Sequence, residues 1–220
     1  MSILENLEQI KATLKEGVEL VAVSKTKPSS AIEEAYAAGQ RIFGENRPQE
    51  MKAKAEELPK DIEWHMIGHL QSKKTKYIAP FVSLIHSVDK LSLLQEINKR
   101  AVQNDRVINV LLQIYIAKEE SKFGMDESEV EELFNSQEFK TLENIQVVGL
   151  MGMATNTDNK DVVRKEFKEL KSFFDTLIKK EKLPNVDLTI LSTGMSGDYS
   201  IAMEEGSNLI RIGSSIFGSR

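Results

Sequence analysis

The chain has 220 residues, of which 40% are hydrophobic and 29% charged, and its formal net charge at pH 7 is -5. These proportions are typical of a globular protein, and the length suffices for one large domain or two small ones. The acidic balance argues against a nucleic-acid groove or an anionic membrane surface as the main partner, but it leaves room for a local anion pocket.

The chain contains no cysteine, which excludes disulfides, thiolate metal sites and cysteine nucleophiles and favours a reducing compartment. Glu5 and Glu8 interrupt the apolar residues near the N-terminus, so this segment resembles neither a signal peptide nor a transmembrane span. We therefore expect a cytoplasmic protein that contacts neither membrane nor nucleic acid.

Short β-branched apolar segments alternate along the chain with longer segments of helical period. The predicted strands are 18–24, 41–44, 62–68, 82–88, 107–116, 145–153, 187–193 and 208–214. The predicted helices are 3–14, 28–38, one ending at Leu58, 72–77, 90–102, 127–133, 160–180 and a short one near Ser200. Each predicted strand is followed by a helix or a helical turn, which implies a parallel sheet.

Eight such strand–helix units in a chain of this length fit a small (β/α)8 TIM barrel with an additional N-terminal helix. An open doubly wound sheet is the competing interpretation, but the last strand ends almost at the C-terminus, which favours closure. No linker or change of composition divides the chain, so we expect residues 1–220 to form a single domain.

In a parallel barrel the functional residues follow the C-terminal ends of the strands. Two loops there have the features of an anion site. Gly194 and Gly197 after the seventh strand allow backbone N–H groups to approach a ligand closely. Gly213 and Ser214 after the eighth strand precede a short turn whose free N–H groups favour an anion. One such loop is typical of an ordinary tight turn, but two at these positions favour a phosphate site.

Lys25 and Lys27 follow the first strand on the same face. A lysine that faces a phosphate site and an arginine such as Arg211 is suited to hold a phosphorylated aldehyde as a Schiff base. The neighbouring cations would favour the neutral amine that an aldehyde requires. The alternative from the residues alone is that Lys25 points to solvent at the end of the strand.

Five motifs, "AVSKTKP", "FGENRPQE", "EWHMIGHLQSKK", "STGMSGDYSIAMEEGS" and "RIGSSIFG", closely resemble those of the pyridoxal-phosphate homeostasis proteins. That family consists of single-domain barrels related to the N-terminal domain of alanine racemases. The similarity extends from the first helix to Arg220, in the same order and at compatible spacings. It implies a (β/α)8 barrel that binds pyridoxal 5′-phosphate (PLP).

The resemblance also implies a role for each matching residue. Lys25 matches the lysine that forms the Schiff base, and Lys27 matches a second lysine that modulates the charge of the pocket. Asn46 matches an asparagine on the ring side of the cofactor, and Arg211 matches the arginine that faces the pyridine nitrogen. Lys122 matches a lysine of a loop motif, with an accessory role in cofactor release.

Four further matches, Met195, Ser196, Gly213 and Ser214, are the residues expected to hold the phosphate. The chain also departs from the family pattern at two places. It has Lys73-Lys74 where relatives have an asparagine before the last lysine, and Arg47-Pro48 where they have an aromatic or aliphatic pair. Both departures add positive charge near the mouth of the barrel.

An arginine facing the ring nitrogen disfavours its protonation and so weakens carbanion chemistry, although alanine racemases share this arginine. A two-domain racemase also needs a tyrosine base from an additional β domain, and this sequence ends shortly after the eighth strand. We therefore expect no catalytic residue. The hypothesis is a monomer that holds PLP reversibly and supplies it to apo-enzymes by transient contact.

Two alternatives remain open: a single-domain PLP-dependent amino-acid racemase, and a PLP-independent phosphosugar-binding barrel enzyme. A metal site is not expected, because His65 and His69 do not share a helix face and His86 has no obvious partner. Glu45 is interpreted as a member of a structural salt bridge, with a general acid or base as the alternative, and Trp64 as a core residue.

Overall fold

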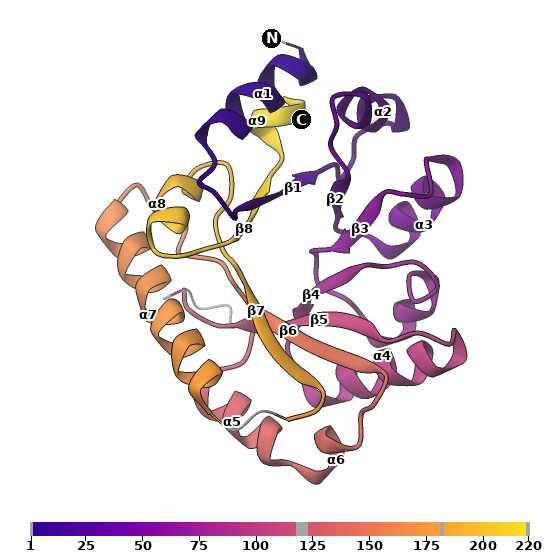
Figure 1. Ribbon diagram of the computed structural model, residues 1–220, viewed down its shortest axis with the longest axis vertical. Coiled ribbons are helices and arrows are strands. Elements are labelled where there is room, and N and C mark those ends of the chain that lie inside the picture. Colours follow the sequence, from indigo (N-terminus) through magenta and orange to yellow (C-terminus); the bar gives the residue numbers. More distant parts are fainter. Residues whose placement is uncertain (1, 118–122, 181–182, 219–220) are drawn as a thin grey trace.

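The computed structural model describes residues 2–117, 123–180 and 183–218. Its strands form a closed parallel barrel in the order β1 to β8, with β8 pairing again with β1. The helices surround this barrel as an outer ring (Figure 1). The predicted (β/α)8 barrel is therefore confirmed, and the open doubly wound alternative is wrong.

The predicted and observed elements agree closely. The strands are β1 (Glu19–Val23), β2 (Ile42–Glu45), β3 (Glu63–Met66), β4 (Leu84–Val88), β5 (Ile108–Ile114), β6 (Ile145–Gly152), β7 (Val186–Ser192) and β8 (Leu209–Ile212). The helices are α1 (Ile3–Thr13), α2 (Ser29–Ala37), α3 (Pro48–Glu57), the 3-10 helix η1 (Ser72–Tyr77), α4 (Leu91–Gln103), α5 (Glu127–Asn135), α6 (Gln137–Lys140), α7 (Lys160–Lys179), α8 (Tyr199–Glu204) and α9 (Ser214–Phe217). The short α6 was not predicted, and α9 was predicted only as a short turn after the eighth strand.

The N-terminal helix α1 begins with a capping box in which Ser2 and Glu5 satisfy each other's backbone N–H groups. It lies beside the C-terminal α9 (Figure 1), and Asn6 Nδ2 donates a hydrogen bond of 2.9 Å to the carbonyl of Ile216. Both ends of the described chain thus pack together on one side of the barrel.

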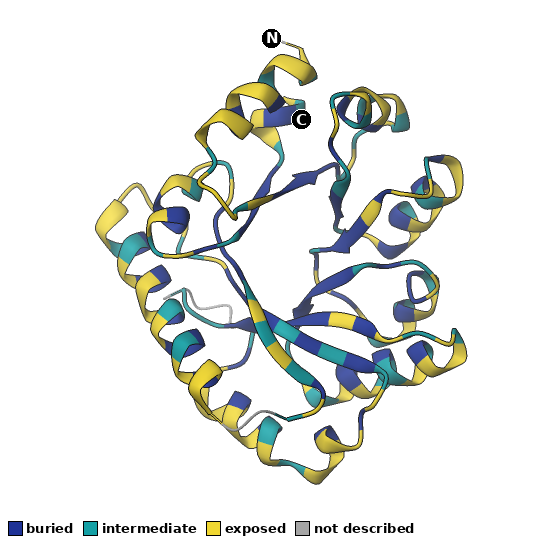
Figure 2. Ribbon diagram, in the orientation of Figure 1, coloured by how far each residue is buried: buried dark blue, intermediate teal, exposed yellow. Residues whose placement is uncertain are grey.

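Successive strand residues face opposite sides of the barrel wall. On β1, Leu20 and Ala22 belong to the core between strands and helices, while Val21 belongs to a separate cluster within the barrel. The inner cluster contains Val21, Leu84, Leu111, Met151 and Leu209. Figure 2 shows that most strand residues are buried, apart from intermediate and exposed residues on β7, whereas the helices expose their outer faces.

This alternation decides which side chains can reach the mouth of the barrel. On β4, the next inward residue after Leu84 is His86. On β8, the next inward residue after Leu209 is Arg211. These polar residues therefore lie above the apolar inner cluster, toward the C-terminal ends of the strands. Among the described residues, no helix has the length and apolar character needed to span a bilayer.

Candidate functional site

A cavity of about 420 Å³ opens at the C-terminal ends of the strands. All the residues for which the sequence predicts cofactor contacts line it: Lys25, Asn46, Met195, Ser196, Arg211, Gly213 and Ser214. The topology brings them together from the ends of β1, β2, β7 and β8. Lys122, the predicted accessory lysine, lies outside the described residues.

The charge of this cavity favours an anionic ligand. Lys25, Lys27 and Arg211 line it, and none of the other described lining residues is acidic. Cations on one concave surface raise the local concentration of anions, even in a protein whose net charge is -5.

Lys25 lies in the turn after β1, and its side chain is half-buried. Its Nζ makes no hydrogen bond or ion pair with any of the residues that the structure describes. Lys27 differs, because its Nζ donates hydrogen bonds to the carbonyls of Phe217, at 2.9 Å, and Gly218, at 3.2 Å. The Lys25 amine thus lies in the cavity lining without a described partner, while Lys27 also ties the turn to the end of α9.

Arg211 is 5% exposed and forms part of the cavity wall. Burial lowers the pKa of its guanidinium to about 10, against the opposing influence of Asp198, so that it remains charged at neutral pH. Its Nη1 donates to the Ser192 carbonyl, at 2.9 Å, and to Ser192 Oγ, at 2.6 Å. Its Nη2 donates to the Gly152 carbonyl at 3.1 Å. These bonds from β6 and β7 fix the orientation of the guanidinium.

A buried polar chain continues from Arg211 into the barrel. Ser192 Oγ lies 3.3 Å from Nδ1 of His86, and Nε2 of His86 lies 3.1 Å from Nδ1 of His65. The expectation that His86 has no obvious partner is therefore wrong. Both histidines occupy inward positions on the neighbouring strands β3 and β4, and that shared orientation was the available signal.

Burial keeps both histidines neutral. It lowers the pKa of His65 to about 3. It also lowers the pKa of His86, and the charge of Arg211 adds to the effect together with the His65 ring. Among the described residues, no group of three or more histidines and carboxylates is placed to hold a metal ion.

The loop after β7 is held by Asp198, a residue to which the sequence assigned no role. The N–H of Met195 donates to Asp198 Oδ1 at 2.6 Å, and the N–H groups of Asp198 and Tyr199 donate back to the Met195 carbonyl. Burial raises the pKa of Asp198, while the Met195 N–H and the charge of Arg211 act in the opposite direction. Asp198 thus shapes the loop that carries Met195 and Ser196.

The two predicted phosphate loops meet at one point. The N–H of Gly213 donates to Ser196 Oγ over 3.4 Å, a long hydrogen bond. A methyl group at Gly213 would lie 3.2 Å from both Cβ and the carbonyl oxygen of Val23. Glycine therefore lets the loop after β8 lie close to β1 beside the cavity.

Four other residues singled out in the sequence lie outside the lining of the cavity, as far as the structure describes it. Glu45 forms the predicted salt bridge, because its Oε1 lies 2.7 Å from Lys54 Nζ. Trp64 is 3% exposed and belongs to the core, as predicted. Arg47 is exposed at the start of α3 and Lys74 lies on η1, but neither is among the described residues that line the cavity.

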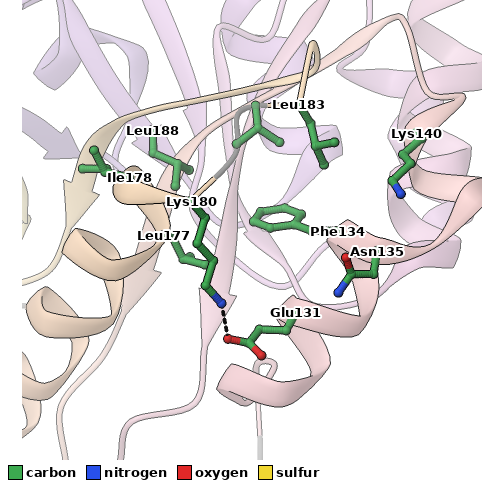
Figure 3. A pocket seen from close by; sticks show the side chains of 10 residues that line it. Glu131, Phe134, Asn135, Lys140, Leu177, Ile178, Lys180, Leu183 and Leu188 are labelled. Carbon is green, nitrogen blue, oxygen red and sulfur yellow. Dashed lines mark hydrogen bonds and ion pairs between the residues drawn. The ribbon is translucent and has the colours of Figure 1, made fainter.

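A second cavity of about 420 Å³ lies on the outside of the barrel, between α5, α7 and β7 (Figure 3). Apolar side chains such as Phe134, Leu177 and Leu188 line it, and an ion pair between Glu131 and Lys180 crosses one side. It shares no described lining residue with the cavity at the barrel mouth. Its position on the helical layer separates it from the strand ends, where the candidate chemical groups gather.

A family model described as the alanine racemase N-terminal domain matches residues 1–220. The chain is 42% identical over 204 residues to the pyridoxal phosphate homeostasis protein of Aquifex aeolicus, covering 91% of this chain and 86% of that protein. It is 38% identical over 234 residues to the pyridoxal phosphate homeostasis protein of Vibrio alginolyticus, covering 100% and 98%.

Solved structures agree with these matches. PipY of Synechococcus elongatus PCC7942, solved with PLP bound, is 36% identical and has a TM-score of 0.88, covering 99% of this chain and 100% of PipY. Alanine racemase of Clostridium difficile 630 has a TM-score of 0.79 at 18% identity, covering 100% of this chain and 57% of the racemase, which shows a shared fold. The chain belongs to the alanine racemase N-terminal domain family and, within it, to the pyridoxal phosphate homeostasis proteins.

Proposed function

We propose that this protein binds PLP reversibly and acts in PLP homeostasis, with Lys25 as the residue that forms a Schiff base with the cofactor. The observation that carries the proposal is the cavity at the barrel mouth, which a lysine amine without a described partner lines together with an arginine and two glycine-serine loops. The relatives named as PLP homeostasis proteins, and PipY with PLP bound, support it.

The residues present fit this cofactor. PLP supplies an aldehyde that condenses with a primary amine with loss of one water, and its phosphate requires hydrogen-bond donors and positive charge. Lys25 provides the amine. Four residues are assigned to the phosphate: Met195 and Ser196 from the loop after β7, and Gly213 and Ser214 from the loop after β8. Asn46 is assigned to the ring side of the cofactor.

Arg211 is assigned to the pyridine nitrogen. Its charge disfavours protonation of that nitrogen, and an unprotonated ring is a poor electron sink. Tyr199, one candidate for a second base, has its hydroxyl 3.3 Å from Thr13 Oγ1 on α1. Alanine racemases share this arginine, so the contact of the Tyr199 hydroxyl with Thr13 is the observation that supports a protein that holds PLP without turnover. The racemase and phosphosugar alternatives are kept as outcomes of the test below.

The proposal also covers the compartment, the oligomeric state and the transfer of the cofactor. We place the protein in the cytoplasm, which the absence of cysteine supports. It acts as a monomer and a single domain, and it passes PLP to apo-enzymes through transient contacts at the exposed barrel mouth.

Absorbance titration with PLP tests the proposal. The wild-type protein is expected to turn yellow on saturation, and Lys25→Ala is expected to lose the visible imine band. Lys52→Ala, which removes an exposed lysine on α3, serves as the control and should match the wild type. A colourless wild-type protein would favour the phosphosugar alternative. Clear conversion of L- to D-alanine, followed by optical rotation, would favour the racemase.

A further inference from the structure

Thr26, the residue after Lys25, has a backbone φ of 64°, in the left-handed region. This conformation is strained for a β-branched side chain. Among the described residues, one other non-glycine residue, Asp105, has a positive φ, and aspartate adopts this region more readily. Such strain persists only where the surrounding structure holds it.

Glu50, on α3, holds the strained turn directly. Its Oε1 accepts a hydrogen bond of 2.6 Å from the N–H of Thr26. Within the turn, the N–H of Lys27 donates to the carbonyl of Ser24 at 3.0 Å. A charged acceptor therefore fixes the backbone on the C-terminal side of Lys25.

Lys54, one helical turn after Glu50, fixes the backbone at Ser24, on the N-terminal side of Lys25. Its Nζ donates to the Ser24 carbonyl at 2.9 Å, to Glu45 Oε1 at 2.7 Å and to Glu50 Oε1 at 2.8 Å. An ammonium group has three N–H donors, so all three are used. The Lys54 side chain is only 8% exposed. The backbone on the N-terminal side of Lys25 is thus fixed by the same group of charges.

Glu45 completes the cluster beneath the turn. Its side chain is fully buried, and its Oε1 also accepts from Ser24 Oγ at 2.6 Å. A buried group of charges loses much of its attraction to the cost of desolvation, so its net stabilisation is small. Its clearest consequence here is geometric, because it specifies the positions of Ser24 and Thr26.

We propose that Glu50, Lys54 and Glu45 are positioning residues that hold the turn so that the side chain of Lys25 enters the cavity. The inference rests on the proposed function. None of the three is among the described residues that line the cavity. They act through the backbone, while Lys25 Nζ would supply the primary amine. Its condensation with an aldehyde would form a C=N bond, break the C=O bond and release the oxygen as water with the two amine hydrogens. Without Glu50, the turn would relax to a negative φ and redirect Lys25.

The test uses Glu50→Ala and the double variant Thr26→Gly/Glu50→Ala. Glycine adopts a positive φ without strain, so it should restore the turn even when Glu50 is missing. We expect Glu50→Ala to lower the equilibrium constant for imine formation with PLP by roughly tenfold. The double variant is expected to return to within about threefold of Thr26→Gly alone.

Three further comparisons separate a change in the position of Lys25 from a general loss of structure. Glu56→Ala removes an exposed carboxylate from the same helix and should leave imine formation unchanged. Binding of 4′-deoxypyridoxine 5′-phosphate, which has no aldehyde, should be equal in Glu50→Ala and the wild type. Glu50→Gln keeps an oxygen acceptor and is the milder variant, with a smaller loss that Thr26→Gly should also reverse.

The outcomes are distinguishable. If the wild type itself forms no imine, the proposed function fails. If the wild type forms it and Glu50→Ala matches Glu56→Ala, the positioning role alone is refuted. The positioning role would also be refuted if Thr26→Gly failed to restore imine formation in either Glu50 variant. The same holds if Glu50→Ala weakened binding of the deoxy analogue as much as it weakened imine formation.

Discussion

Nε2 of His86 lies 3.1 Å from Nδ1 of His65 in the interior of the barrel. The direction of this hydrogen bond follows from Arg211, which has only N–H donors. Ser192 Oγ accepts from Arg211, so its own hydrogen is directed to Nδ1 of His86. His86 then donates from Nε2 to His65, and both rings are neutral.

The buried histidines predict a loss of stability on acidification. The pKa of His65 is about 3 in the folded protein and near 6.5 in the unfolded chain, so the unfolded state takes up a proton first as the pH falls. Stability is complete above pH 6.5 and decreases toward pH 3, by about 1 kcal/mol per pH unit for this group between pH 6.5 and 5. Urea unfolding at several pH values measures the slope.

The matched variants are His65→Gln and His69→Gln. His65→Gln should reduce the pH slope by about 1 kcal/mol per unit, whatever its effect at neutral pH. The side chain of His69 is 50% exposed and lies 3.9 Å from Asp89, so His69→Gln is the surface-histidine control against which the slope of His65→Gln is compared. Equal slopes in the wild type and His65→Gln would show that His65 does not contribute in this way.

Lys54→Met tests the charge cluster through stability. The substitution leaves the buried Glu45 without its cation, and we expect the free energy of unfolding to fall by about 3 kcal/mol at pH 8. Burial already raises the pKa of Glu45, and loss of the Lys54 hydrogen bond raises it further. A carboxyl group with a raised folded pKa stabilises at low pH and loses that contribution as the pH rises. The loss should therefore be smaller at pH 5.

Lys52→Met is the control for this prediction, because Lys52 lies on the same helix with its side chain 48% exposed and pairs with Glu56 at 3.5 Å. It should change stability by no more than about 0.5 kcal/mol at either pH. A Lys54→Met loss that is independent of pH would mean that Glu45 does not take up a proton in the variant.

Gly194→Ala and Gly197→Ala compare two glycines of the loop after β7. Gly194 has a φ of 86°, and an added methyl group would lie 2.6 Å from Ala202 Cβ and 3.0 Å from Tyr199 Cα. Its replacement should cost about 2 kcal/mol or more. A methyl group at Gly197 meets no described atom within 4 Å, so its replacement should be nearly neutral. Equal melting temperatures would contradict this.

The repeating pattern of the chain was enough to predict the barrel, because alternation of strands and helices depends on local composition. The helix α6 was not predicted because it has only four residues and one buried apolar side chain, Phe139. Its start depends on Ser136 Oγ, which accepts from the Phe139 N–H. A single cap of this kind leaves no periodic signal in the sequence.

The site was predictable as a set of residues but not in its supporting contacts. The alternation of side chains along each strand indicates that His65 and His86 face inward. Their hydrogen bond, however, depends on the register between β3 and β4. The left-handed Thr26 runs against the preference of a β-branched residue. It is set by Glu50, which comes from a different element.

Reduction with borohydride followed by peptide mass mapping tests the central claim most directly. The protein is loaded with PLP, reduced, digested and searched for a pyridoxyl group. The account predicts the label on the peptide that contains Lys25, and its absence from that peptide in Lys25→Ala. A label found only on Lys27 or Lys122, or an equal yield from Lys25→Ala, would contradict it.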